Sequence, residues 1–166
     1  MEHIYLLTGG KITPIIDNLF LSCHFAAINE NTLKKNKIDC IVKMYGNGKK
    51  NGAYTYHPDI EYLEIDALDI PEYRISKHFV ECFKFINSNI KKKKNVLVHC
   101  HAGISRSSTI IIMYLMVKYK ITLAKAYEYV KSKRSIIQPN RGFSTELQRL
   151  DKFLETTSTK SNGTTQ

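Results

Sequence analysis

The sequence lacks any hydrophobic segment long enough to cross a membrane, and its N-terminus lacks the features of a secretion signal. The longest uninterrupted apolar run, from Ile110 to Val117, has eight residues, whereas a membrane-spanning helix needs about 20. The first three residues supply no basic segment, and the apolar stretch from Ile4 to Leu7 is too short for a signal peptide. We therefore expect a protein without membrane association, located in the cytoplasm, with the nucleus as a second compartment.

Cysteine is scarce, and its spacing fits neither a disulfide framework nor a metal site. The four cysteines, at positions 23, 40, 82 and 100, form no CxxC pair, so reduced intracellular thiols are the expectation. His99 and His101 flank Cys100, but no second His/Cys cluster has the spacing of metal ligands. We expect no metal and no other cofactor.

Acidic residues are few relative to basic ones. The chain has 15 Asp and Glu against 25 Lys and Arg, a net charge of +10 over 166 residues. A surplus of this size favours anionic partners such as phosphoproteins, nucleic acids or anionic lipids. A lysine-rich surface without any such partner is an equally weighted alternative.

The order of apolar patterns predicts one α/β domain. Strand patterns occupy residues 12–16, 19–21, 38–44, 60–65 and 96–98. Helical patterns occupy residues 26–37, a segment capped by Ser76 that runs to residue 90, residues 105–119, a segment capped by Thr122, and residues 143–154. Strands separated by helices, then consecutive helices, predict a central, mostly parallel sheet of about five strands flanked by helices.

The C-terminal segment differs from the rest of the chain. Residues 156–166 are rich in Ser and Thr and contain no apolar side chain. We therefore expect a folded domain over residues 1–155 and a disordered polar tail over residues 156–166.

The stretch from His99 to Ser108 carries one thiol in a tight turn between an apolar strand and an apolar helix. Cys100 and Arg106 are six positions apart, with Gly103 between them. A turn of this kind directs backbone N–H groups inward, and the helix N-terminus adds partial positive charge. Arg106 adds a planar fork that matches two phosphate oxygens, and the positive field favours the thiolate form of Cys100. Although a lone cysteine is often inert, this pattern predicts a thiolate that attacks phosphorus.

The pattern His-Cys-x-x-Gly-x-x-Arg-Ser resembles the active-site loop of the cysteine-dependent protein tyrosine phosphatases. Residues 99–109, His-Cys-His-Ala-Gly-Ile-Ser-Arg-Ser-Ser-Thr, resemble that of the dual-specificity phosphatases in particular. The resemblance runs from about Ile12 to Leu154 and includes residues 62–65 and the Pro-Asn-Arg-Gly-Phe of residues 139–143. It implies a small, atypical catalytic domain with a tyrosine phosphatase-like fold and no kinase-docking domain. It also implies that substrate phosphate is bound by His101, Ala102, Gly103, Ile104, Ser105 and Arg106.

The chemistry needs an acid that protonates the leaving oxygen. Candidate carboxyl groups before the phosphate loop are those of Glu64, Asp66, Asp69 and Glu72. We favour Asp69 over Asp66, because it lies in a Leu-Asp-Ile-Pro loop and falls where the dual-specificity pattern places its general acid. An ordinary carboxylate at a strand end is the alternative for Asp66.

Three further roles are implied by the resemblance. Ser107, the hydroxyl after the arginine, is expected to help the thiolate leave during hydrolysis of the phosphocysteine. His99 is expected to hydrogen-bond around the loop and tune the thiol, with a buried neutral histidine of no special role as the alternative. Asn140 matches the asparagine that braces the phosphate loop, although a turn-forming Asn after Pro139 would look the same.

Two cysteines outside the loop raise a redox hypothesis, since some relatives protect the nucleophile through a disulfide. Cys40 lies on a predicted core strand that could neighbour the strand leading to Cys100, and Cys82 lies on an apolar helix face. Small core residues are the favoured alternative for both.

The function expected from these patterns is a phosphatase acting on phosphotyrosine and phosphoserine or phosphothreonine in proteins. Family members that have lost catalysis usually lack the cysteine or the arginine, so a phosphoprotein-binding module is the less favoured alternative. The loop has no lysine, unlike lipid phosphatases that resemble the tensin homologue. An RNA 5′-phosphatase is a minor alternative that rests on the basic charge, so we expect phosphorylated proteins rather than nucleic acid as partners.

Overall fold

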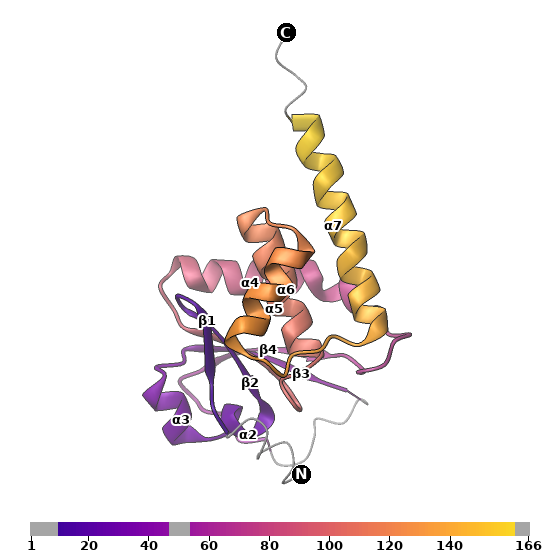
Figure 1. Ribbon diagram of the computed structural model, residues 1–166. Helices are drawn as coiled ribbons and strands as arrows, with labels where there is room; N and C mark the ends of the chain where they lie inside the picture. The colour runs from indigo at the N-terminus through magenta and orange to yellow at the C-terminus, as the bar shows by residue number, and fades with distance from the viewer. Residues whose placement is uncertain (1–9, 47–53, 162–166) are drawn as a thin grey trace.

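A computed structural model describes residues 10–46 and 54–161 and shows one α/β unit built on a five-stranded sheet (Figure 1). The strand order is β1-β2-β5-β3-β4; β1 runs antiparallel to β2, and the other three pairs are parallel. The strands are β1 (Thr13–Ile16), β2 (Leu19–Cys23), β3 (Cys40–Tyr45), β4 (Glu61–Asp66) and β5 (Val96–Cys100). This confirms the expected mostly parallel sheet of five strands.

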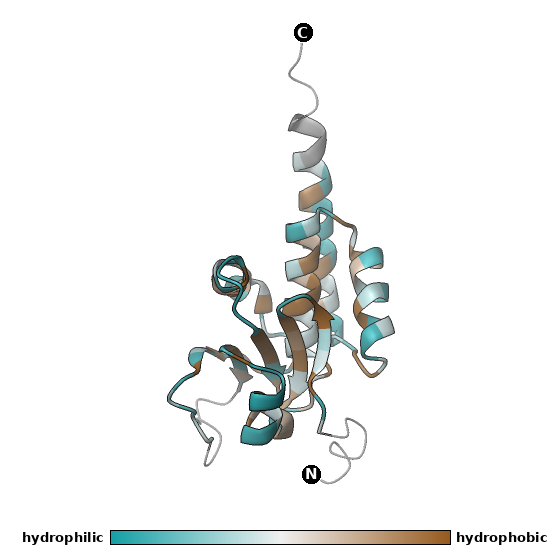
Figure 2. Cartoon of the chain, turned by 90° about the vertical axis from the view of Figure 1, so that its left-hand side faces the viewer, coloured by the Kyte–Doolittle hydropathy of each residue, from teal (hydrophilic) through white to brown (hydrophobic). Residues whose placement is uncertain are grey.

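Helices cover both faces of the sheet (Figure 1). The short helices α2 (His24–Ala27) and α3 (Glu30–Lys35) lie on one face, over a smaller core. The other face carries the larger core and the remaining helices, which are the 3-10 helix η1 (Ile75–His78), α4 (Phe79–Lys91), α5 (Arg106–Tyr119), α6 (Leu123–Lys133) and α7 (Arg141–Ser161). Because both faces are covered, every residue of β5 is buried, and Figure 2 shows apolar residues concentrated on the strands.

Helix α5 lies at the centre of the larger layer. Ten consecutive residues, Ser107 through Met116, are buried, as expected of a helix that packs on neighbours all round. It ends at Tyr119, and the next residue, Lys120, adopts the left-handed conformation with φ 53°.

Two helix predictions are wrong: the extent of the helix over residues 26–37 and the cap at Ser76. The single helix expected over residues 26–37 is divided, because the Asn29 side chain accepts a hydrogen bond from the Thr32 amide and starts α3 as a new helix. Ser76 does not cap a helix; it lies inside η1, and α4 begins at Phe79 without a side-chain cap. The predicted Thr122 cap of α6 is confirmed, since its hydroxyl accepts from the Lys125 amide.

The predicted disordered tail is wrong for residues 156–161. Helix α7 runs to Ser161 and projects beyond the rest of the molecule (Figure 1). A helix that has already formed extends at little cost per residue, and the Thr156 and Thr157 hydroxyls donate to carbonyls of the preceding turn. Residues 162–166 lie outside the described residues. No helix in the described parts of the chain has the length and apolar character needed to cross a bilayer.

Candidate active site

The connections of two neighbouring strands leave the sheet in opposite directions at the carboxyl end of β5. Strand β2 leads into α2 on one face, whereas β5 leads through residues 101–105 into α5 on the other. A crevice outside the carboxyl ends of parallel strands is where open α/β sheets bind ligands. The predicted phosphate loop therefore lies at the topological switch point of the sheet.

Cys100 is the last residue of β5 and is 1% exposed. Its Sγ lies 3.1 Å from the Oγ of Ser107, which is fully buried in the first turn of α5. When Cys100 is a thiolate, the Ser107 hydroxyl is the donor of this hydrogen bond. The structure thus brings the predicted nucleophile and the predicted assisting hydroxyl together.

Donors outside the loop hold its carbonyl groups outward. The His101 carbonyl accepts from the His24 amide at 3.0 Å, and the Ile104 carbonyl accepts from the Gln138 amide at 2.9 Å. In a planar trans peptide, the carbonyl and the next N–H point in opposite directions. The amides that follow these carbonyls, those of Ala102 and Ser105, are thereby turned into the loop, where they can bind an anion.

Gly103 is the one loop position that requires glycine. Its φ of +67° is in the left-handed region, and a Cβ there would lie 2.5 Å from the Ser22 carbonyl oxygen. A side chain would therefore force the loop away from the end of β2.

Arg106 and Asp69 face each other across the loop. The Arg106 Nη1 donates to the Ala67 carbonyl at 3.2 Å, and its Nε lies 3.5 Å from Asp69 Oδ2. Asp69 Oδ1 accepts from Ser105 Oγ at 2.7 Å and from Asn140 Nδ2 at 2.9 Å. Because two donors tether Oδ1, Oδ2 is the carboxyl oxygen that can exchange a proton with a substrate.

The competing carboxyl groups have other surroundings. Asp66 ends β4 and is exposed, Glu64 forms an ion pair with Lys43 at 3.2 Å, and Glu72 lines a cavity between residues 71–74 and α7. Asp69 contacts both Ser105 and Arg106. The role of Asp69 as the acid stays a prediction.

Asn140 connects three parts of the site. Its amide donates to Ser105 Oγ at 3.1 Å, its side-chain nitrogen holds Asp69, and its side-chain oxygen accepts from the Phe143 amide. It therefore connects Ser105 of the loop to Asp69 and to the first turn of α7.

His99 is buried beneath the loop and is neutral. Its Nδ1 faces the Cys100 carbonyl at 3.3 Å, and its Nε2 lies 3.2 Å from the Tyr54 hydroxyl. Since a carbonyl only accepts, Nδ1 carries the proton and Nε2 accepts from Tyr54. Burial lowers the pKa of His99 to about 3, and the nearby charges of His24, Lys43 and Arg106 act in the same direction.

The residues that hold His99 from the side belong to no sequence motif. The Tyr54 ring stacks on His99 with a 9° interplanar angle, and the buried Lys43 places its Nζ 3.9 Å from the centre of the Tyr54 ring. Lys43 pairs in register with both His99 and Glu64. Lys43, a basic residue within an apolar strand, was the sequence signal that pointed to a polar network here.

Acid is expected to destabilise the fold through His99. Between pH 6.5 and 5 the unfolded chain binds a proton at this residue and the folded chain does not, so stability falls as the pH falls. The difference is about 2 kcal/mol over this range. Chemical denaturation at both pH values should show a smaller pH effect in His99→Gln than in wild type, because His24 and His78 titrate in both proteins. Equal pH effects in the two proteins would contradict a neutral, buried His99.

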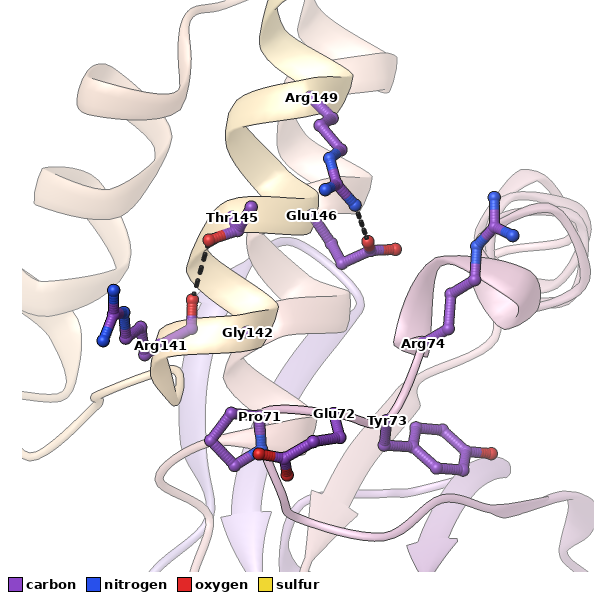
Figure 3. Close-up of a pocket in the computed structure, with 9 residues that line it drawn as sticks. All are labelled: Pro71, Glu72, Tyr73, Arg74, Arg141, Gly142, Thr145, Glu146 and Arg149. Atoms are coloured by element: carbon purple, nitrogen blue, oxygen red, sulfur yellow. Dashed lines mark hydrogen bonds and ion pairs between the residues drawn. The ribbon is translucent and has the colours of Figure 1, made fainter.

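A cavity of about 500 Å³ lies next to the loop that carries Asp69, between residues 71–74 and the first turns of α7 (Figure 3). The two walls are in close contact at Gly142 and Pro71. A Cβ on Gly142 would lie 1.8 Å from the Pro71 carbonyl oxygen. Arg149 donates to Glu146 at 2.7 Å, and the Arg141 side chain points away from both (Figure 3). Because its charges are mixed and do not converge, we interpret this region as the support of the Asp69 loop rather than as a substrate site.

The redox hypothesis for Cys40 is wrong on geometry. Cys40 pairs in register with Val96, four residues before Cys100 on β5, or about 13 Å along the strand, whereas a disulfide needs Cα atoms within about 7 Å. Cys23 is instead the register partner of Cys100. Burial raises the pKa of Cys40 to about 11 and that of Cys82 to about 12, as expected of core thiols.

The described residues contain no group of three or more His, Cys, Asp or Glu side chains arranged to hold a metal ion.

Comparison with known proteins supports the interpretation of the loop. A family model described as dual specificity phosphatase, catalytic domain, matches residues 19–153. The chain is 37% identical over 140 residues to dual specificity protein phosphatase 15 of Mus musculus, covering 84% of this chain and 57% of the mouse protein. It is 36% identical over 151 residues to dual specificity protein phosphatase 1B of Arabidopsis thaliana, covering 90% and 88%.

Solved structures share the fold. The human tyrosine phosphatase-like serine/threonine/tyrosine-interacting protein superposes with a TM-score of 0.81 and 30% sequence identity, covering 86% of this chain and 97% of that one. The chain spans 57% of the length of the mouse relative, so the match concerns the catalytic domain. The chain belongs to the dual specificity phosphatase catalytic-domain family.

Proposed function

We propose that the chain is a protein phosphatase that hydrolyses phosphotyrosine and phosphoserine or phosphothreonine through a phosphocysteine intermediate. The observation that carries the proposal is the tethering of Asp69 by Ser105 and Asn140, which leaves Oδ2 facing Arg106. The nucleophile Cys100, the anion-binding Arg106 and the acid Asp69 thus meet at one loop.

In the first step, the Cys100 thiolate attacks phosphorus opposite the ester oxygen. The S–P bond forms as the P–O bond breaks, and Asp69 Oδ2 gives its proton to the leaving oxygen. Arg106 and the inward amides stabilise the equatorial oxygens of the phosphoryl group. A bound phosphate takes the place of Asp69 as the partner of Arg106, so that Asp69 can face the leaving group.

In the second step, Asp69 accepts a proton from water, which attacks phosphorus as the S–P bond breaks. The electron pair returns to Cys100 as a thiolate, and the Ser107 hydroxyl at 3.1 Å donates to it. Inorganic phosphate leaves, and Asp69 is again protonated for the next cycle.

A panel of matched substrates tests the substrate class. One peptide carrying phosphotyrosine, phosphothreonine or phosphoserine at the same position is incubated with the protein, and phosphate release is measured beside an RNA with a 5′-triphosphate end. We expect release from all three peptides and none from the RNA. Turnover of the RNA alone would overturn the proposed protein substrate, and stoichiometric binding without turnover would identify a phosphoprotein-binding module.

A further inference from the structure

Arg134 is a buried arginine that sequence analysis did not single out. It follows α6, is 6% exposed, and lies against the outside of the phosphate loop. Its Nε donates to the Gly103 carbonyl at 3.0 Å, and its Nη1 donates to Thr13 Oγ1 at 3.1 Å. One side chain thus joins the end of α6, the start of β1 and the middle of the loop.

Within residues 10–46 and 54–161, the charge of Arg134 has no carboxylate partner. Among the described residues, no Asp or Glu lies within ion-pair distance of it, and its buried Nη2 makes no hydrogen bond. Burial lowers the pKa of Arg134, while the thiol groups of Cys23 and Cys100 act in the opposite direction. A buried cation without a counterion is costly, so its presence beside an anion-binding loop calls for a role there.

The hydrogen bond to Gly103 fixes the orientation of one peptide group. Since the Gly103 carbonyl is held outward, the N–H of Ile104 in the same planar peptide points into the loop. We infer that Arg134 is a positioning residue: it turns the Ile104 N–H toward the phosphoryl group and adds positive charge behind the loop. The inference rests on the proposed phosphatase function, which it deepens.

The Gly103 carbonyl differs from its neighbours in how it is held. The carbonyls of His101 and Ile104 each accept from a backbone amide, a donor that only a proline substitution removes, and the Ile104 carbonyl also accepts from the Ser108 hydroxyl. The Gly103 carbonyl accepts from the Arg134 side chain. Gly103 itself has a positive φ, and glycine has no side chain that would restrict the orientation of the peptide group. Substitution of Arg134 therefore releases one specific oxyanion donor.

The test compares Arg134→Met and Arg134→Lys with wild type. Tungstate, a stable phosphate mimic, is titrated calorimetrically, and kcat and KM are measured for an aryl phosphate. In Arg134→Met we expect kcat to fall about 100-fold, the typical cost of one oxyanion donor, with a smaller change in KM and weaker tungstate binding. Arg134→Lys should lie between the two, because lysine keeps the charge but lacks the fork that reaches both Gly103 and Thr13.

Lys133→Met is the matched control, since Lys133 is the neighbouring cation at the end of α6 but is exposed, with its Nζ 5.4 Å from the centre of the Tyr129 ring. It should keep the kcat and tungstate affinity of wild type. A merely destabilised protein would bind less tungstate per chain but with unchanged affinity per site. Wild-type kcat and tungstate affinity in both Arg134 variants would overturn the inference. If Arg134→Met does not fold, Arg134→Lys alone decides, and wild-type values there overturn it.

Failure of the proposed function has a different signature. A wild-type protein that releases no phosphate from any substrate contradicts the proposed function, yet its tungstate affinity still reports on Arg134.

Discussion

Replacing Cys100 with Ser is expected to abolish turnover while leaving oxyanion binding intact. A serine hydroxyl is not ionised at neutral pH, so the attacking group is lost, and the rate should fall by at least about 10⁴-fold. Arg106 and the inward amides remain, so tungstate should still bind in a calorimetric titration. The hydroxyl also fits the space of the thiol, so the fold should be retained.

Cys40→Ala is the control for this substitution. Cys40 is buried at the opposite end of the sheet from the loop, so its removal should lower stability without removing turnover. Phosphate release by Cys100→Ser at the wild-type rate would exclude Cys100 as the nucleophile.

Asp69→Asn is expected to slow the enzyme in a way that depends on the leaving group. Asparagine keeps an oxygen that accepts from Ser105, but its amide is too weak an acid to protonate the leaving oxygen. For phenyl phosphate, whose leaving oxygen is strongly basic, we expect a loss of about 10²-fold or more. For a nitro-substituted aryl phosphate, whose leaving group departs without a proton, the loss in the first step should be much smaller. The ratio of the two rates is the measurement.

Asp66→Asn tests whether position 69 is specific. Asp66 is three residues away, at the exposed end of β4, so its substitution should leave the ratio unchanged. A changed ratio in Asp66→Asn, with an unchanged one in Asp69→Asn, would transfer the acid role to Asp66.

The parts of the site that the sequence predicts are local in the chain. Cys100, Ser107 and Arg106 lie within eight residues, and a strand followed by a glycine turn and a helix fixes their geometry over that distance. Asp69 and Asn140 came from the family pattern, and their contacts to Ser105 show how two distant segments meet at the loop.

The parts that the sequence does not predict depend on tertiary contacts. Arg134 holds Gly103 across 31 positions, and Tyr54 holds His99 across 45. Neither belongs to a motif, and a basic or aromatic residue in a polar segment is most often exposed. The register that places Cys23 rather than Cys40 beside Cys100 depends in the same way on strand order, which periodicity alone does not reveal.

The central claim is that the phosphoryl group passes through the sulfur of Cys100. Ser107→Ala removes the hydroxyl that assists the leaving thiolate, so the second step should become slower than the first and the intermediate should accumulate. The direct measurement is rapid mixing of this variant with a ³²P-labelled aryl phosphate, a denaturing quench within the first turnover, and peptide mapping. We predict one labelled phosphoryl group on Cys100 per active chain; label on any other residue, or turnover without a labelled chain, would contradict the account.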